Sequence, residues 1–139
     1  MKYTGQIAAA VVAVTSLSSC VTMSPDGVKR FEFSKIAVSG ERTQQGTAWL
    51  IKPNCTMDSM PNIRALEGPK HGKFVVVHED LFPTSAAGDY RKCRTVKVLG
   101  AVGYYTSDKG YIGQDRMVAR VSYANGRVED TVLTIKVVK

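Results

Sequence analysis

Arg116-Met-Val-Ala-Arg-Val-Ser-Tyr123 is the stretch that decides the fold class, together with Val128-Glu-Asp-Thr-Val-Leu-Thr-Ile-Lys-Val-Val138 just after it. Apolar side chains fall at the odd positions of both stretches, whereas Arg120 points the other way. A period of two is typical of β-strands that bury one face. Asn125-Gly126 separates the stretches and tolerates the positive φ of a tight turn. The sequence therefore predicts a β-hairpin whose two strands contribute to a common core.

Short strand-like segments fill most of the chain before this hairpin. They are rich in β-branched and aromatic residues and are separated by turns of Gly, Pro, Asn and Asp. No window of about twelve residues keeps a helical period. The candidate strands are residues 30–34, 35–38, 47–51, 63–66, 73–78, 94–99 and 101–105. This pattern indicates an antiparallel β-sandwich or a barrel.

The composition is that of a folded chain with a basic surface. The protein has 139 residues, of which 44% are hydrophobic and 22% charged, and its net charge is +7. These values exclude wholesale disorder and allow one domain with an appendage. Its two histidines leave little material for a zinc site or a histidine-based catalytic triad.

The first twenty residues have the pattern of an export signal. Lys2 is followed by the apolar run Ile7–Leu17, which is too short to span a bilayer but suits a signal peptide. The ending Leu17-Ser18-Ser19-Cys20 resembles the lipobox of bacterial lipoproteins. The resemblance implies that residues 1–19 are removed and that the thiol of Cys20 receives a diacylglycerol. The alternatives are an ordinary secretory signal that ends near a cysteine, or an uncleaved anchor.

The residues after Cys20 bear on location and domain limits. Val21 stands where an aspartate would signal retention in the inner membrane of enteric bacteria, so the resemblance favours the outer membrane. The protein is then a lipid-anchored component of a bacterial cell envelope, facing the periplasm or exposed on the surface. Residues 20–28 have turn composition and are expected to form a lipidated tether. The folded domain is expected to occupy residues 29–139.

Three segments of the chain after residue 63 resemble bacterial immunoglobulin-like, cadherin-like repeats. Gly68-Pro-Lys-His-Gly-Lys-Phe-Val-Val76 is similar to the turn that opens such a repeat. Tyr104–Asp115 is similar to their Tyr-Thr-Pro-x-x-Gly-Phe-x-Gly-x-Asp segment, and residues 117–138 match the closing hairpin. The resemblance covers residues 63–138 and implies an all-β fold, an immunoglobulin-like antiparallel β-sandwich. The chain has one copy where the family has tandem arrays.

Cys55 and Cys93 are the cysteines that remain once Cys20 carries lipid. An even pair in an exported chain predicts a structural disulfide. The bond would close a loop of roughly 40 residues, which is worth about 4 kcal/mol in the chain-entropy model. Free buried thiols or a reactive pair are the alternatives.

Few side chains suggest chemistry. His78, Glu79 and Asp80 are adjacent and would point to opposite faces of a strand, which disfavours a metal site, and His71 lies in a turn. Asp115 is expected to accept hydrogen bonds from turn amides rather than to bind calcium. The sequence has no Gly-x-Ser-x-Gly elbow and no glycine-rich phosphate loop. We therefore expect no enzymatic activity, no cofactor and no metal.

Arg91, Lys92 and Arg94 form the densest basic cluster, with Lys97 close by. This cluster is a candidate patch for an anionic ligand, and the alternative is a solvated edge strand that its charges protect from aggregation. The sequence thus predicts a non-catalytic module that binds an envelope component, such as an anionic polymer, or a protein partner. Nucleic acid is not an expected ligand. The alternative function is an inhibitor or accessory subunit of an envelope enzyme or secretion assembly.

Overall fold

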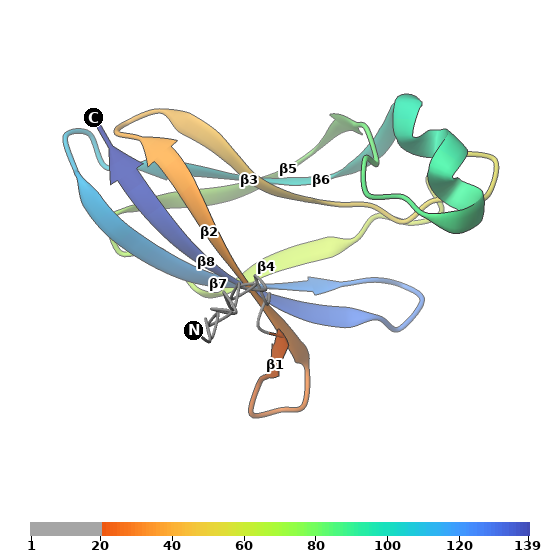
Figure 1. The fold of residues 1–139 in the computed structure, drawn as a ribbon, viewed down its shortest axis with the longest axis horizontal. Helices are drawn as coiled ribbons and strands as arrows, with labels where there is room; N and C mark the ends of the chain where they lie inside the picture. Colours follow the sequence, from red (N-terminus) through yellow and green to blue (C-terminus); the bar gives the residue numbers. More distant parts are fainter. Residues whose placement is uncertain (1–20) are drawn as a thin grey trace, which may run out of the picture.

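The predicted C-terminal hairpin is formed by β7 (Gly113–Ser122) and β8 (Val128–Val138), which pair in antiparallel register from Gly113 with Val137 to Ser122 with Val128. It lies inside the larger of two sheets in the computed structural model, which describes residues 21–139 (Figure 1). Cys20 and the signal segment 1–19 lie outside the described residues.

The two sheets are built from eight strands. The larger sheet has the order β1-β2-β8-β7-β4 and the smaller one the order β3-β6-β5. The remaining strands are β1 (Val21–Met23), β2 (Lys29–Val38), β3 (Arg42–Ala48), β4 (Asn62–Glu67), β5 (Gly72–Leu81) and β6 (Val98–Ser107). A 3₁₀ helix, η1 (Gly88–Thr95), lies between β5 and β6. Within residues 21–139 there is no helix with the length and apolar character needed to span a membrane.

This strand order is that of an immunoglobulin-like sandwich. Strands β4, β7 and β8 correspond to one sheet of such a domain, and β3, β6 and β5 to the other. The all-β sandwich expected from the sequence is therefore confirmed. One pair departs from the antiparallel expectation, because β2 runs parallel to β8 from Lys29 beside Glu129 to Val38 beside Val138.

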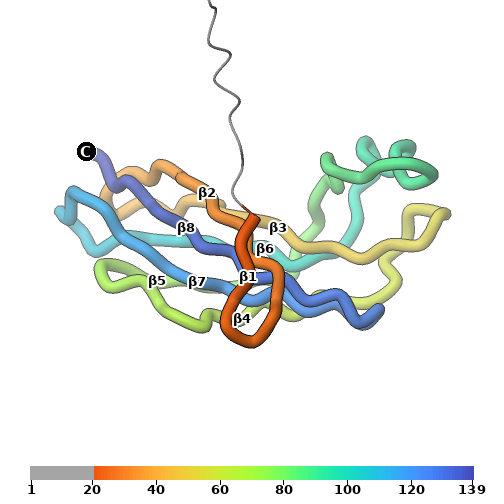
Figure 2. The backbone as a smooth tube through the Cα atoms, turned by 60° about the horizontal axis from the view of Figure 1, so that its bottom comes forward, coloured from red at the N-terminus to blue at the C-terminus, as the bar shows by residue number. Residues whose placement is uncertain are grey.

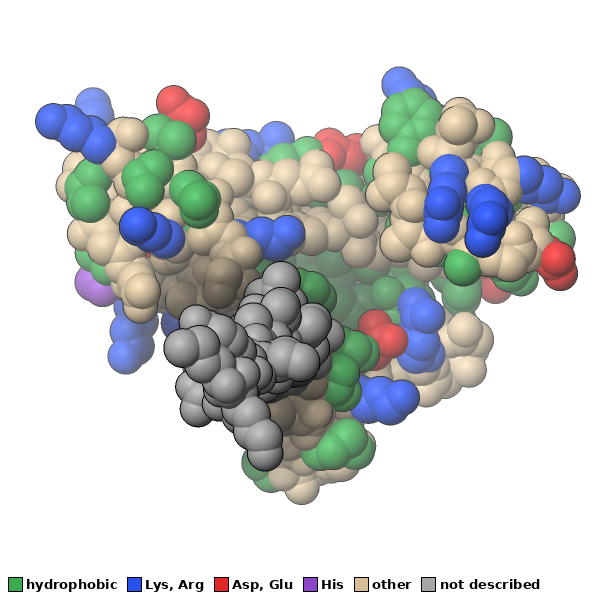
Figure 3. Space-filling view, viewed as in Figure 1, with side chains coloured by type: hydrophobic (Ala, Val, Ile, Leu, Met, Phe, Trp, Pro, Cys, Tyr) green, Lys and Arg blue, Asp and Glu red, His purple; other side chains and the backbone are tan. Residues whose placement is uncertain are grey.

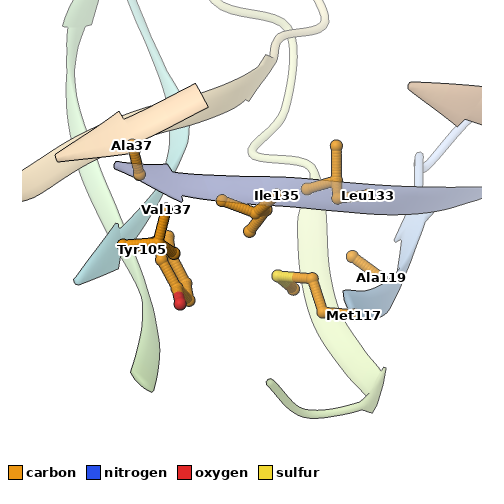
Figure 4. Packing of buried hydrophobic residues seen from close by; sticks show 7 residues of the cluster. All are labelled: Ala37, Tyr105, Met117, Ala119, Leu133, Ile135 and Val137. Carbon is orange, nitrogen blue, oxygen red and sulfur yellow. The ribbon is translucent and has the colours of Figure 1, made fainter. Parts of the chain in front are cut away.

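The main core lies between the two sheets. Side chains from four strands point toward one another there, and Tyr105, Met117 and Ile135 have no exposed surface (Figure 4). The odd positions of β7 and β8 supply most of this core, as the alternation predicts. The cluster consists of Ala37, Tyr105, Met117, Ala119, Leu133, Ile135 and Val137.

A second apolar cluster covers the opposite face of the smaller sheet. Val98 and Val102 lie an odd number of residues from Tyr105 on β6, so they point away from the main core. They pack with Ile51, Leu81 and Cys93, and η1 and the segment after β3 cover them. Together they form the lobe on the right of Figure 1, where η1 is drawn as a coiled ribbon.

Asp115 holds the turn between β4 and β5, as the sequence predicts. Its carboxylate accepts hydrogen bonds from the amides of Lys70 (2.9 Å) and His71 (3.0 Å) and from the Tyr105 hydroxyl (2.9 Å). Burial by itself would raise the pKa of Asp115, but these hydrogen bonds outweigh it and hold the pKa below its usual value. Burial and the hydrogen bond to Asp115 raise the pKa of the Tyr105 hydroxyl well above its usual value.

Four expected segments differ in the structure. Residues 30–34 and 35–38 belong to one strand, β2, and the strand expected over 47–51 ends at Ala48. Residues 94–99 do not form a strand from the start, since η1 extends to Thr95. Cys93 is fully buried and disulfide-bonded, which holds this charged segment in a helical turn against the second cluster.

Residues 21–28 were expected to be only a tether, yet they form β1 and a tight turn. Val21 pairs with Phe31 and Met23 with Lys29. The Ser24 amide donates to the Val28 carbonyl at 2.8 Å. Figure 2 shows the resulting β1–β2 hairpin in front of the sandwich. Residues 21–28 therefore belong to the folded domain, because backbone hydrogen bonds join this segment to the sheet.

Candidate functional site

A cleft opens where the two sheets diverge, between the segment after β3 and the tip of the β7–β8 hairpin. Its volume is about 620 Å³. Figure 3 shows it as a hollow beneath the lobe that carries η1. Four aromatic residues line it: Phe33, Trp49, Tyr90 and Tyr123. The other lining residues are Thr47, Ala48, Leu50, Ile51, Ser85, Asn125, Arg127 and Glu129.

The larger sheet supplies the floor of the cleft. Phe33 pairs with the core residue Leu133, so its ring lies on the face turned toward the other sheet. It is nevertheless 47% exposed. Tyr123 follows β7 and continues the inward alternation of Met117 and Ala119. Both rings are thus core-type residues that the diverging sheets leave open to the cleft.

The η1 lobe supplies the opposite wall. Trp49 and Tyr90 each pack against the second apolar cluster, which contains Cys93. The disulfide between Cys55 and Cys93 has an S–S distance of 2.08 Å and a Cα–Cα distance of 5.3 Å, which confirms the predicted pairing. It joins the loop after β3 to η1 and so fixes these two aromatic residues relative to each other.

Polar groups lie at the rim beside the aromatic floor. The Arg127 guanidinium carbon is 3.9 Å from the centroid of the Tyr123 ring, a cation–π contact. Arg127 Nε is 3.5 Å from Glu129 Oε1. Burial raises the pKa of Tyr123, and the neighbouring Arg127 opposes that rise. Tyr123 is therefore a neutral hydrogen-bond donor at physiological pH.

The chemistry available here is stacking and hydrogen bonding. Glu129 is the one carboxylate among the described residues that line the cleft, and it is paired with Arg127. Aromatic faces with a few polar groups at the rim are typical of binding pockets. The cleft is thus suited to hold a ligand with flat apolar faces and polar edges.

The predicted basic cluster lies on η1, directly after the cleft residue Tyr90. Side chains three residues apart share one side of a 3₁₀ helix. Tyr90 and Cys93 point toward the body of the domain, so Arg91 and Arg94 lie together on another side. Arg94 Nε donates to the Ala86 carbonyl at 2.6 Å.

The structure thus brings Arg91 and Arg94 together and leaves Lys92 on a different side of η1. The alternative interpretation, an edge strand protected by its charges, is wrong, because this segment is helical. Lys97 lies beyond the helix, with its Nζ 5.9 Å from the centroid of the Phe82 ring.

The other candidate side chains lie outside the cleft. The rings of His71 and Tyr111 stack with their centroids 4.0 Å apart. Glu79 accepts a hydrogen bond from the Tyr104 hydroxyl. Between Val21 and Lys139, no three His, Cys, Asp or Glu side chains are grouped so that they could hold a metal ion.

Sequence reasoning did not identify the cleft. Phe33 and Trp49 lie in segments expected to be ordinary strands, and Tyr90 lies outside every expected strand. Nothing in their local pattern says where the sheets diverge. The alternation puts Tyr123 on the inward face. Its position at the end of that strand, beside the Asn125-Gly126 turn, is the one feature of the sequence that points to the cleft.

No protein-family model, curated protein or solved structure matches this chain.

Proposed function

We propose that the protein is a lipid-anchored, non-catalytic binding module of a bacterial cell envelope, and that it binds the saccharide units of an anionic envelope polymer. The observation that carries this proposal is the aromatic cleft of about 620 Å³. The lipobox-like ending at Cys20 supplies the anchor and the favoured location at the outer membrane.

The aromatic residues on both sides of the cleft support a saccharide ligand. The face of an aromatic ring is electron-rich and attracts the weakly positive C–H groups of a sugar ring. Phe33 and Tyr123 offer such faces from one wall, and Trp49 and Tyr90 offer them from the other. Asn125 and Arg127 lie beside them with amide and guanidinium groups that can bind hydroxyl or carboxylate oxygens.

The charges support an anionic polymer. Removal of residues 1–19 takes away one lysine and leaves a net charge of +6. Arg127 lies at the rim, and Arg91 and Arg94 extend the positive charge along η1. Guanidinium groups bind phosphates and carboxylates in two-point contacts. Single exposed charge pairs contribute little, so several must act together along a chain-like ligand.

Fluorescence of Trp49 tests the proposal directly, because it is the protein's single tryptophan and it lines the cleft. We expect soluble fragments of peptidoglycan or of lipopolysaccharide saccharide to shift its emission in a saturable titration. Phe33→Ser should weaken this binding roughly tenfold or more, since it removes one stacking face. Absence of any saturable change would contradict the proposal.

A matched control is available. Phe82 is also 47% exposed but does not line the cleft. Phe82→Ser therefore removes an equally exposed aromatic ring and should leave saccharide binding unchanged. Equal effects of the two variants would mean that the titration reports general hydrophobicity rather than the cleft.

A further inference from the structure

The β1–β2 hairpin has one apolar face that the sandwich does not cover. Val21 is 53% exposed, Met23 61% and Phe33 47%. Val21 pairs with Phe31, and the alternation of each strand puts Met23 and Phe33 on the same side as this pair. We call Val21, Met23 and Phe31 the hairpin face, which Phe33 borders on the side of the cleft. Figure 1 shows the β1 end of the hairpin standing clear of the smaller sheet.

Two lysines flank the hairpin face. Lys29 pairs with Met23, and Lys35 follows Phe33 by two residues, so both lie on the same side of β2 as the face. Both are exposed. Glu32 lies at an even position and points to the opposite side. An apolar centre with cations at its margin is complementary to the interface of an anionic bilayer.

The hairpin is held firmly to the domain. Asp26 Oδ2, in the turn after β1, is 2.7 Å from Arg120 Nη1 on β7. Arg120 also makes two hydrogen bonds to the buried Asp130, at 2.6 and 2.9 Å. The hairpin face therefore keeps a fixed orientation relative to the sandwich.

The position of Cys20 connects this face to a membrane. Val21, which pairs with Phe31, is the residue directly after Cys20. Consecutive Cα atoms are about 3.8 Å apart, so acyl chains on Cys20 would begin beside the hairpin face with no linker between.

We propose that the hairpin face lies on the surface of the anionic lipid bilayer that holds the anchor. This inference rests on the proposed lipidation of Cys20. Phe33 lines the cleft and borders the hairpin face, so its ring stays available to stack on a saccharide. The cleft is then presented to saccharides at the bilayer surface, rather than to polymers at a distance from it.

The test uses the mature lipoprotein in vesicles of phosphatidylcholine and phosphatidylglycerol. A membrane-impermeant amine reagent modifies exposed lysines, and mass spectrometry measures each site. The labelling of Lys29 and Lys35 is divided by that of Lys73, an exposed lysine on β5 at an edge of the smaller sheet. We expect this ratio to rise about fivefold in Met23→Glu, because a carboxylate on the face is repelled by the anionic interface.

Ile36→Glu is the matched control. Ile36 is 65% exposed on the other side of β2, where it pairs with Lys136, so its substitution should leave the ratio unchanged. An unchanged ratio in Met23→Glu, or an equal rise in both variants, would overturn the inference. A far-ultraviolet circular dichroism spectrum that matches the wild type confirms that the fold of each variant is intact.

The intact mass of the mature protein distinguishes failure of the lipid-anchor proposal from failure of the hairpin-face proposal. A protein without acyl chains contradicts the proposed anchor, and flotation of that unacylated chain with the same vesicles then tests the face alone. Flotation of the wild type but not of Met23→Glu supports the hairpin face as a lipid-binding surface. Failure of the wild type to float overturns it.

Discussion

The Tyr105 hydroxyl donates a hydrogen bond to Asp115 across 2.9 Å, and this contact joins β6 of the smaller sheet to β7 of the larger one. Tyr105 has no exposed surface and Asp115 is only 4% exposed. The same carboxylate accepts the amides of Lys70 and His71 from the β4–β5 turn. One buried side chain thus connects two sheets and a turn.

Asp115→Ala should destabilise the protein by roughly 2–5 kcal/mol, because one buried donor and two partly buried ones lose their acceptor, at about 1–3 kcal/mol for a buried donor. Tyr105→Phe removes one of these hydrogen bonds and leaves the amides paired, so its cost should be smaller. Urea denaturation at pH 7 measures both. A larger decrease in the free energy of unfolding for Tyr105→Phe than for Asp115→Ala would contradict this account.

Acid should reduce the contribution of Asp115. Its folded pKa is below the usual value of 3.8, so its stabilisation is present above that pH and is lost as the pH falls through the folded pKa. The difference in unfolding free energy between wild type and Asp115→Asn should therefore be constant near neutral pH and shrink below about pH 4. A difference that grows on acidification would show that the folded pKa is raised.

Asp130→Ala should be among the most destabilising single changes. Asp130 is fully buried and receives two hydrogen bonds from Arg120, which is only 15% exposed. Removal of one partner from a buried ion pair costs about 3–5 kcal/mol. Asp26→Asn removes a half-exposed partner of the same arginine and is the matched control with a smaller effect. Thermal unfolding of the two variants measures this order.

Loss of the Cys55–Cys93 bond should cost about 2–5 kcal/mol. The double variant Cys55→Ser/Cys93→Ser should also change the emission of Trp49, since Trp49 packs against the cluster that contains Cys93. Peptide mapping without reduction should find one linked pair in the exported wild-type protein. Two thiols that react with an alkylating reagent in native material would contradict the pairing.

Cys20→Ala should abolish acylation and leave an unprocessed precursor, because the lipoprotein signal peptidase acts after the thiol is modified. Metabolic labelling with a clickable fatty acid measures this. Cys55→Ser is the control, and its labelling should equal that of the wild type. Equal labelling of Cys20→Ala and wild type would exclude the lipoprotein assignment.

Substitution of Arg91, Lys92 and Arg94 by Gln should reduce co-sedimentation with anionic envelope polymers and make the remainder less sensitive to salt. Arg91 and Arg94 share one side of η1, so Arg91→Gln/Arg94→Gln should account for most of the loss. Lys70→Gln/Lys73→Gln is a control of equal charge away from the helix. If neither double substitution changes co-sedimentation, the charges on η1 are only solvated and do not bind the polymer.

Local pattern was sufficient for most of the β-strands, the last hairpin and the disulfide. The alternation in residues 116–123 and 128–138 identified their buried face correctly, because side chains on a strand alternate whatever the strand pairs with. An even pair of cysteines after an expected export signal was enough to pair Cys55 with Cys93. The expectation that Asp115 accepts hydrogen bonds from turn amides was also correct.

Only the tertiary structure decided which strands pair with each other and where the cleft lies. A period of two does not say which strand lies beside which, so the parallel pairing of β2 with β8 and the docking of residues 21–28 were not foreseen. η1 replaced an expected strand because Cys93 is buried and bonded to Cys55, a long-range constraint that local propensity does not contain. Phe33 and Tyr123 have the pattern of core residues, and they line a cleft because the two sheets diverge over them. Divergence depends on how whole sheets pack, which no single stretch of sequence specifies.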